Sequence, residues 1–238
     1  MKTSNLLQEG KLEDILPEDN GKKRFCMVID LKKCIGCETC TVSCSVENNV
    51  LATNPWNVVM DVTEGSFPNY KRKFIPKPCM HCEKPPCVDV CPTNASYRND
   101  DIGIVGIKQS QCIGCRACVT ACPYQARSMN WSSPMKILGQ NPSVPKRRMG
   151  VVEKCTFCLH KIEPALKEGK QIGTTIHNRD NTAVVSPACI PTCVATARYF
   201  GDLNDPESEV SEILRNNKFK VMLGWANTKP NVFYLDTE

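Results

Sequence analysis

Residues 34–44 read Cys-Ile-Gly-Cys-Glu-Thr-Cys-Thr-Val-Ser-Cys, a spacing of C-x2-C-x2-C-x3-C. Sixteen of the seventeen cysteines fall into four blocks related to this one. The first block is Cys34, Cys37, Cys40 and Cys44, and its spacing returns at Cys112, Cys115, Cys118 and Cys122. A longer variant, C-x2-C-x4-C-x3-C, is formed by Cys79, Cys82, Cys87 and Cys91. The last block consists of two pairs separated by thirty residues, Cys155 with Cys158 and Cys189 with Cys193.

This spacing predicts iron–sulfur clusters. Three cysteines within seven residues can wrap one loop around a [4Fe–4S] cube, while the fourth, about one helical turn further on, points elsewhere. In two-cluster ferredoxins that fourth cysteine ligates the other cluster, and a proline commonly follows it. Gly36 and Gly114 lie inside the loops, where the missing Cβ permits a positive φ and lets backbone N–H groups approach the sulfurs.

Two other uses of cysteine fit less well. Disulfides would go with looser spacings and a secretory signal, and we recognise neither. A structural zinc site needs four thiolates from two C-x2-C knuckles, which the last block alone resembles. A zinc-stapled interaction module is therefore the rival from another class. A brown colour with absorption near about 400 nm, bleached by dithionite, would eliminate it.

Composition sets limits on the fold and on the partners. Only 6% of the 238 residues are aromatic, so we expect a small apolar core and a fold stabilised largely by cluster assembly. The formal charge of +5 counts the thiols as neutral. Four oxidised clusters would bring it to about −3, so the basic runs do not indicate nucleic-acid binding.

Repetition along the chain predicts an α+β fold of tandem bacterial-type 2[4Fe–4S] ferredoxin-like units. Cys34 and Cys112 are 78 residues apart, and Cys79 and Cys155 are 76 apart. Into these units we place a strand at 25–29, an inserted hairpin at 56–75, a loop at 132–150 and a late helix at 208–215. Asp205 is expected to cap that helix, with Pro206 at its first position.

The predicted organisation has three parts. Residues 1–24 form a polar N-terminal extension without a recognisable secretory or twin-arginine signal. Residues 25–204 form the iron–sulfur domain, with the first and last blocks in 25–50 and 151–200 and the middle blocks in 75–130. Residues 205–238 form the helix and an extended tail that contacts a partner. No stretch reaches the eighteen apolar residues of a membrane span.

A few residues outside the blocks carry specific expectations. Cys26 lies in an apolar strand and is expected to be an inert core residue, not a ligand. His81 lies between two ligands, so it either donates a hydrogen bond near a cluster or occupies an exposed loop. Trp56, Trp131 and Trp225 are expected to be packing residues rather than electron relays.

Taken together, these residues resemble a known family. The chain is similar to the four-cluster iron–sulfur subunits of the molybdopterin oxidoreductases of the dimethyl-sulfoxide-reductase family, including those of polysulfide, thiosulfate, tetrathionate and arsenate reductases and of membrane-bound sulfite dehydrogenase. The resemblance covers about residues 25–204. It is carried by Cys34-Ile35-Gly36-Cys37, Cys79-Met80-His81-Cys82 with Pro85-Pro86-Cys87, Cys112-Ile113-Gly114-Cys115, Lys154-Cys155-Thr156-Phe157-Cys158, and Phe200-Gly201-Asp202.

The resemblance implies four [4Fe–4S] clusters with crossed ligands. Cluster 1 would be held by Cys34, Cys37, Cys40 and Cys193, and cluster 2 by Cys155, Cys158, Cys189 and Cys44. Cluster 3 would be held by Cys79, Cys82, Cys87 and Cys122, and cluster 4 by Cys112, Cys115, Cys118 and Cys91. The residues agree in one respect, because prolines follow Cys91 and Cys122 but not Cys44 or Cys193.

The function implied is electron transfer rather than catalysis. A separate subunit with molybdenum or tungsten pterin would convert the substrate, a sulfur or arsenic compound, and an integral-membrane subunit would handle quinone. The chain itself would bind neither a small-molecule substrate nor nucleic acid. It would lie peripherally on the cytoplasmic membrane, either on the cytoplasmic side or exported together with the catalytic subunit. The rival within electron transfer is a free-standing soluble polyferredoxin.

Overall fold

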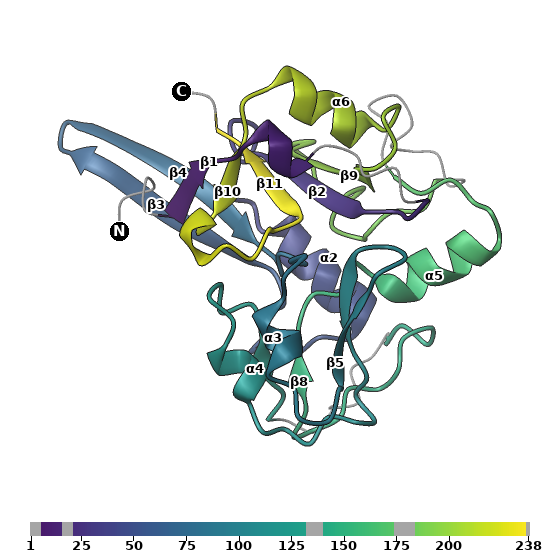
Figure 1. Ribbon diagram of the computed structural model, residues 1–238. Helices are drawn as coiled ribbons and strands as arrows, with labels where there is room; N and C mark the ends of the chain where they lie inside the picture. The colour runs from purple at the N-terminus through teal and green to yellow at the C-terminus, as the bar shows by residue number, and fades with distance from the viewer. Residues whose placement is uncertain (1–5, 16–20, 132–139, 174–183, 237–238) are drawn as a thin grey trace.

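A five-stranded sheet forms the upper half of the molecule (Figure 1). The computed structural model describes residues 6–15, 21–131, 140–173 and 184–236. The strand order is β1-β10-β11-β2-β9, with β2 parallel to β11 and antiparallel to β9. The strands are β1 (Leu7–Glu9), β2 (Phe25–Asp30), β9 (Arg198–Asp202), β10 (Lys220–Met222) and β11 (Val232–Leu235).

Strand β2 separates two cores because side chains alternate between the faces of a sheet. Phe25, Met27 and Ile29 pack on the face that also carries buried cysteines. Cys26 and Val28 point to the other face, which is covered by α6 (Glu209–Asn216). The strand predicted at 25–29 is thus confirmed, and so is the helix predicted at 208–215.

The predicted cap of α6 is wrong. The helix begins after Ser208, and Asp205 instead accepts a hydrogen bond from the backbone N–H of Glu207 at 2.9 Å. Residues 205–208 form a separate turn closed by the backbone bond from Ser208 to Asp205. The Asp-Pro pair therefore stabilises that turn and not the helix.

Both terminal segments belong to the sheet, which extends across the domain boundaries predicted from the sequence. Strand β1 pairs with β10, and β11 pairs with β2 through four residues. The described part of the polar N-terminal extension also holds the 3-10 helix η1 (Leu12–Ile15), and the tail holds η2 (Gly224–Ala226). The segment 216–238 is therefore not an unattached tail, because β11 lies in the interior of the sheet.

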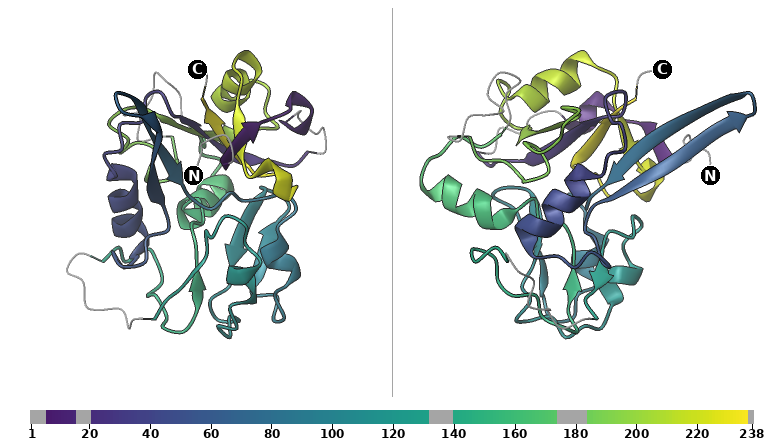
Figure 2. Two further views of the ribbon diagram at one scale, coloured as in Figure 1. Left: turned by 90° about the vertical axis from the view of Figure 1, so that its left-hand side faces the viewer. Right: turned by 180° about the vertical axis from the view of Figure 1, so that it is seen from behind.

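The inserted hairpin is confirmed and is longer than predicted. It consists of β3 (Val58–Ser66) and β4 (Asn69–Lys77), which pair over their full length. It projects from the body as a two-stranded arm (Figures 1 and 2), and Phe67 at its tip is 88% exposed.

Short elements around the cysteine blocks make up the rest, consistent with the predicted α+β class of tandem ferredoxin-like units. The helices are α2 (Thr39–Asn48), α3 (Pro86–Asp89), α4 (Ala117–Thr120) and α5 (Leu159–Lys167). Two small hairpins are formed by β5 (Ser96–Asn99) with β6 (Ile104–Ile107) and by β7 (Ser128–Met129) with β8 (Val152–Glu153). Of the loop predicted at 132–150, residues 132–139 lie outside the described residues, and 140–150 contain neither helix nor strand. Among the described helices, none has the length and apolar character needed to span a bilayer.

Candidate metal centres

The fold brings the sixteen cysteines into four groups of four, each drawn from two blocks. We number them as the clusters were numbered. Quartet 1 lines a cavity of about 350 Å³ with Cys34, Cys37, Cys40 and Cys193. Quartet 4 lines a second cavity of nearly the same volume, about 320 Å³, with Cys91, Cys112, Cys115 and Cys118. Two cavities of equal size and equal lining suit the same guest.

Quartets 2 and 3 are recognised from the mutual influence of their thiols. Burial raises the pKa of Cys44 well above its usual value, and the neighbouring thiols of Cys155, Cys189 and Cys158 raise it further. Burial likewise raises the pKa of Cys82 to about 12. The hydroxyl of Thr228 opposes this effect, and the thiols of Cys79, Cys87 and Cys122 add to it. Thiols with such pKa values must lose protons before they can bind iron.

The first and third cysteine loops have the same backbone conformation. Gly36 and Gly114 both have φ of +71°, and the residues two positions later, Glu38 and Arg116, are also left-handed. A Cβ on Gly36 would lie 2.4 Å from the ring of Phe74, and one on Gly114 would lie 2.2 Å from the carbonyl oxygen of Gly150. Glycine is thus required in both loops by conformation and by close approach.

The fourth cysteines divide into two kinds. Three are followed by one turn, in which the residue three positions on is left-handed and donates its N–H back to the cysteine carbonyl; these residues are Asn94, Gln125 and Thr196. Cys44 instead lies inside α2, which continues to Asn48. The duplication is therefore clear at three positions and altered at the fourth.

Hydrogen-bond donors point at several sulfurs. The backbone N–H groups of Ala197 and Ser96 donate to Cys193 and Cys91, each at 3.3 Å. The amide of Asn57 donates to Cys40 at 3.2 Å. Such donors stabilise negative charge on sulfur and help to set cluster potentials. Four thiols that surround a cavity and carry these donors fit a [4Fe–4S] cluster. No three Cys, His, Asp or Glu side chains in the described ranges converge on a point suited to a single metal ion.

Exposure and proximity arrange the quartets in the order 1-2-3-4. Cys37 and Cys115 are exposed, whereas all four thiols of quartet 2 are buried. In quartet 3 three thiols are buried and Cys122 is half-buried. Cys189 of quartet 2 lies close enough to Cys40 of quartet 1 for its pKa to respond, and Cys155 responds in the same way to Cys79 of quartet 3. Arg127 is near thiols of both quartet 3 and quartet 4.

Cys26 and His81 differ sharply from loop residues. Cys26 is fully buried on the face of β2 that packs against α6, away from the quartets, and burial raises its pKa. The alternative of an exposed His81 is wrong, because the ring is fully buried and stacks on Phe157 at 3.7 Å. Its Nδ1 accepts the N–H of Val105 at 3.2 Å, so the proton of the neutral ring lies on Nε2. Burial, then Lys154 and Arg127, keep the pKa of His81 well below its usual value.

Only one tryptophan packs as predicted. Trp56 is buried under the guanidinium of Arg147, which lies 4.3 Å from the ring centroid. Trp131 and Trp225 are 65% and 68% exposed, so the packing prediction is wrong for both. Trp131 lies against Arg116, beside quartet 4.

Sequence reasoning missed two polar residues at quartet 1. Arg198 is fully buried, and its Nη2 donates to Cys40 at 3.2 Å and to the amide oxygen of Asn57 at 3.1 Å. Asn57 is seventeen residues from Cys40 and gave no signal. Arg198 had one, because it is a lone charge at the start of the apolar run Tyr199-Phe200.

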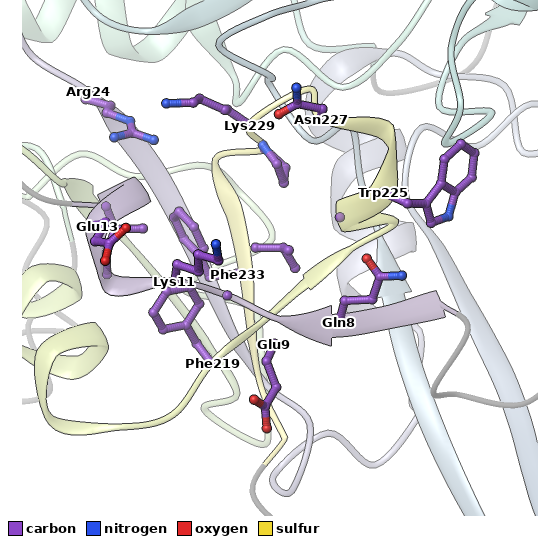
Figure 3. Close-up of a pocket in the computed structure, with 15 residues that line it drawn as sticks. Gln8, Glu9, Lys11, Glu13, Arg24, Phe219, Trp225, Asn227, Lys229 and Phe233 are labelled. Carbon is purple, nitrogen blue, oxygen red and sulfur yellow. The ribbon is translucent and has the colours of Figure 1, made fainter.

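A pocket apart from the quartets lies between β1 and the C-terminal segment (Figure 3). Aromatic and charged side chains mix in its walls, among them Phe219, Phe233, Lys11 and Glu13. Its described lining residues include no cysteine, so this pocket belongs to the terminal strands and not to the metal centres.

Comparison with known proteins defines first the class and then the family. Residues 33–95 and 70–138 each match a 4Fe-4S dicluster domain. The chain is therefore an iron–sulfur protein that carries multiple [4Fe–4S] clusters.

Three relatives extend this result. The chain is 40% identical to the iron-sulfur cluster-binding subunit of menaquinone reductase of Nitratidesulfovibrio vulgaris, over 90% of this chain and 89% of that one. It is 37% identical to a subunit of selenate reductase of Mesobacillus selenatarsenatis, over 89% and 72%. It is 35% identical to the iron-sulfur subunit of arsenate respiratory reductase of a Shewanella species, over 89% and 96%. The chain belongs to the iron–sulfur subunits of the dimethyl-sulfoxide-reductase family. It is an electron-transfer subunit of a multi-subunit oxidoreductase and not the catalytic one.

Proposed function

We propose that quartets 1 to 4 each hold one [4Fe–4S] cluster and that the chain conducts electrons singly along this row. Cys26 is not a ligand in this assignment. The observation that carries the proposal is the order of the quartets, with two buried groups between two groups that each have an exposed cysteine loop. When bound, the clusters supply the one-electron carriers, and the chain spaces, insulates and hydrogen-bonds them.

The two ends of the row fit two different partners, because exposed apolar side chains gather at both. At quartet 1, Ile35 lines the cavity, Val194 follows Cys193, and Val42 and Val46 lie one turn apart on α2. All four are exposed.

At quartet 4, Ile113 lines the cavity, Val90 precedes Cys91, and Trp131 lies on Arg116. Met149 adjoins Gly150, whose carbonyl approaches Gly114. These four side chains are also exposed. Exposed apolar groups of this kind mark protein–protein contacts. We name the two groups the quartet 1 surface and the quartet 4 surface.

The partners in the proposal are a molybdopterin subunit with molybdenum or tungsten and an integral-membrane subunit that reacts with quinone. The complex would act on a sulfur, selenium or arsenic compound, because relatives are named for selenate, arsenate and tetrathionate reductases and for sulfite dehydrogenase. Its peripheral place on the membrane follows from the quinone-reactive partner, which the menaquinone reductase relative supports.

Anaerobic purification of the native complex tests the proposal. We expect about sixteen irons per chain, four paramagnetic signals on reduction, and co-elution with a molybdenum or tungsten subunit. Elution of an iron-replete chain alone at 26.5 kDa would favour the soluble polyferredoxin. Zinc in place of iron would overturn the proposal entirely.

A further inference from the structure

Three cations are buried among the cysteines. Arg198 and Lys154 are each 1% exposed and Arg127 is 4% exposed. Within the described residues, no carboxylate forms a salt bridge with any of the three. A buried cation without a compensating anion is costly, so another negative group is needed beside each.

Each cation lies where two quartets meet. Arg198 donates to Cys40 of quartet 1 and also interacts with Cys189 of quartet 2. Lys154 acts on Cys155 of quartet 2 and on Cys87 of quartet 3. Its ammonium group donates to the carbonyl oxygens of Val105 and Cys155.

Arg127 occupies the third junction. It lies near Cys87 and Cys79 of quartet 3 and Cys118 of quartet 4, and it donates to the hydroxyl of Ser96 at 2.7 Å. The row of four quartets thus has three junctions with one buried cation at each. We call these residues the junction cations.

The two arginines occupy equivalent places in the duplicated fold. Arg198 is five residues after Cys193, and Arg127 is five residues after Cys122. Both follow the same left-handed turn, at Thr196 and at Gln125. For Arg198, burial alone would lower the pKa, but the thiols of Cys189, Cys40 and Cys193 outweigh burial and raise it. The surroundings of these arginines therefore favour the charged form.

We propose that the junction cations set the reduction potentials of the two clusters on either side of them. The inference rests on the proposed function, since it needs clusters in the four quartets. An electron that arrives at either neighbouring quartet adds negative charge beside the cation, which stabilises it. Because each cation is shared, it also weakens the repulsion between electrons on adjacent quartets. They are positioning residues and not ligands.

The test is a potentiometric titration of the anaerobic holo-complex, followed by electron paramagnetic resonance. In Arg198→Gln the midpoint potentials of clusters 1 and 2 should fall while those of clusters 3 and 4 stay unchanged. Arg127→Gln should give the mirror result, with only clusters 3 and 4 shifted. Arg198→Lys keeps the charge and should shift them less. Arg215→Gln, which removes an equal charge on exposed α6, is the matched control and should shift none.

The outcomes separate the inference from the proposed function. Wild-type protein without four titrating clusters would overturn the proposed function. Four clusters with unchanged potentials in iron-replete Arg198→Gln and Arg127→Gln would overturn the inference alone, as would equal shifts in Arg198→Lys and Arg198→Gln. If every variant without the charge loses iron while Arg198→Lys keeps it, the cations serve assembly and the inference about potentials is wrong.

Discussion

The two end quartets and the two inner quartets use the same ligands but are built differently. Quartets 1 and 4 are cavities closed by glycine-containing loops, with backbone N–H donors to Cys193 and Cys91 and an exposed cysteine in each. Quartets 2 and 3 lie among the buried residues that form the main core, alongside Phe157 and Ile190. The ends are thus arranged for exchange with partners, whereas the inner quartets also hold the fold together.

The largest expected effect comes from removing an inner ligand. Cys155→Ser should abolish the stable fold, because cluster assembly at the core contributes much of the folding free energy. Cys115→Ser should leave a folded chain with about twelve irons, since it removes one end cluster. Iron analysis and limited proteolysis on anaerobic protein measure the difference. Cys26→Ala is the control, with full iron and a loss of about 1 kcal/mol of stability from the core. Equal protease resistance of the Cys155 and Cys115 variants would remove the distinction between ends and interior.

A second prediction concerns the crossing of the blocks. Cys193→Ser and Cys34→Ser should disturb the same paramagnetic signal, although 159 positions separate the two residues. The cavity that both residues line is the reason. Cys44→Ser should disturb a different signal, the one also altered by Cys158→Ser. If Cys44→Ser instead altered the signal of Cys34→Ser, the first block would hold one cluster by itself and the crossed assignment would fail.

The third prediction compares the glycines of the two end loops. Gly114→Ala should destabilise the holo-protein more than Gly36→Ala, because its Cβ would meet a carbonyl oxygen of the backbone rather than the ring of Phe74. Each variant also carries a left-handed penalty of about 1 kcal/mol. We expect a total of roughly 2–4 kcal/mol for Gly114→Ala, from overpacking added to that penalty. Thermal denaturation under anaerobic conditions measures both. Phe74→Leu should partly rescue Gly36→Ala, and failure of that rescue would show that conformation alone demands the glycine.

The parts of this comparison that the sequence predicted are those encoded at short range. Spacings of two and three residues place thiols on one loop, so the blocks and the strand before Cys34 follow from local geometry. Pairing across the chain does not. Strand β1 has only three residues, and β11 joins β2 from about two hundred residues away, so neither carries a local signal. His81 shows the same limit, because its spacing between ligands says nothing about the Phe157 ring that buries it.

The smallest expected effect separates the two ends by their partners. Ile35→Ser on the quartet 1 surface and Ile113→Ser on the quartet 4 surface should each leave iron content unchanged, because both side chains point outward. Each should weaken association with one partner subunit only, by roughly tenfold, the loss of about 1–2 kcal/mol common for one apolar contact. Trp225→Ser is the matched control, since Trp225 is as exposed as these residues but lies by the pocket of the terminal strands. Co-purification and quantitative binding of the separated subunits measure the effect. If both variants weakened the same partner, or if Trp225→Ser did so equally, the row would not have one partner at each end, and the contrast between end and inner quartets would reflect assembly rather than electron exchange.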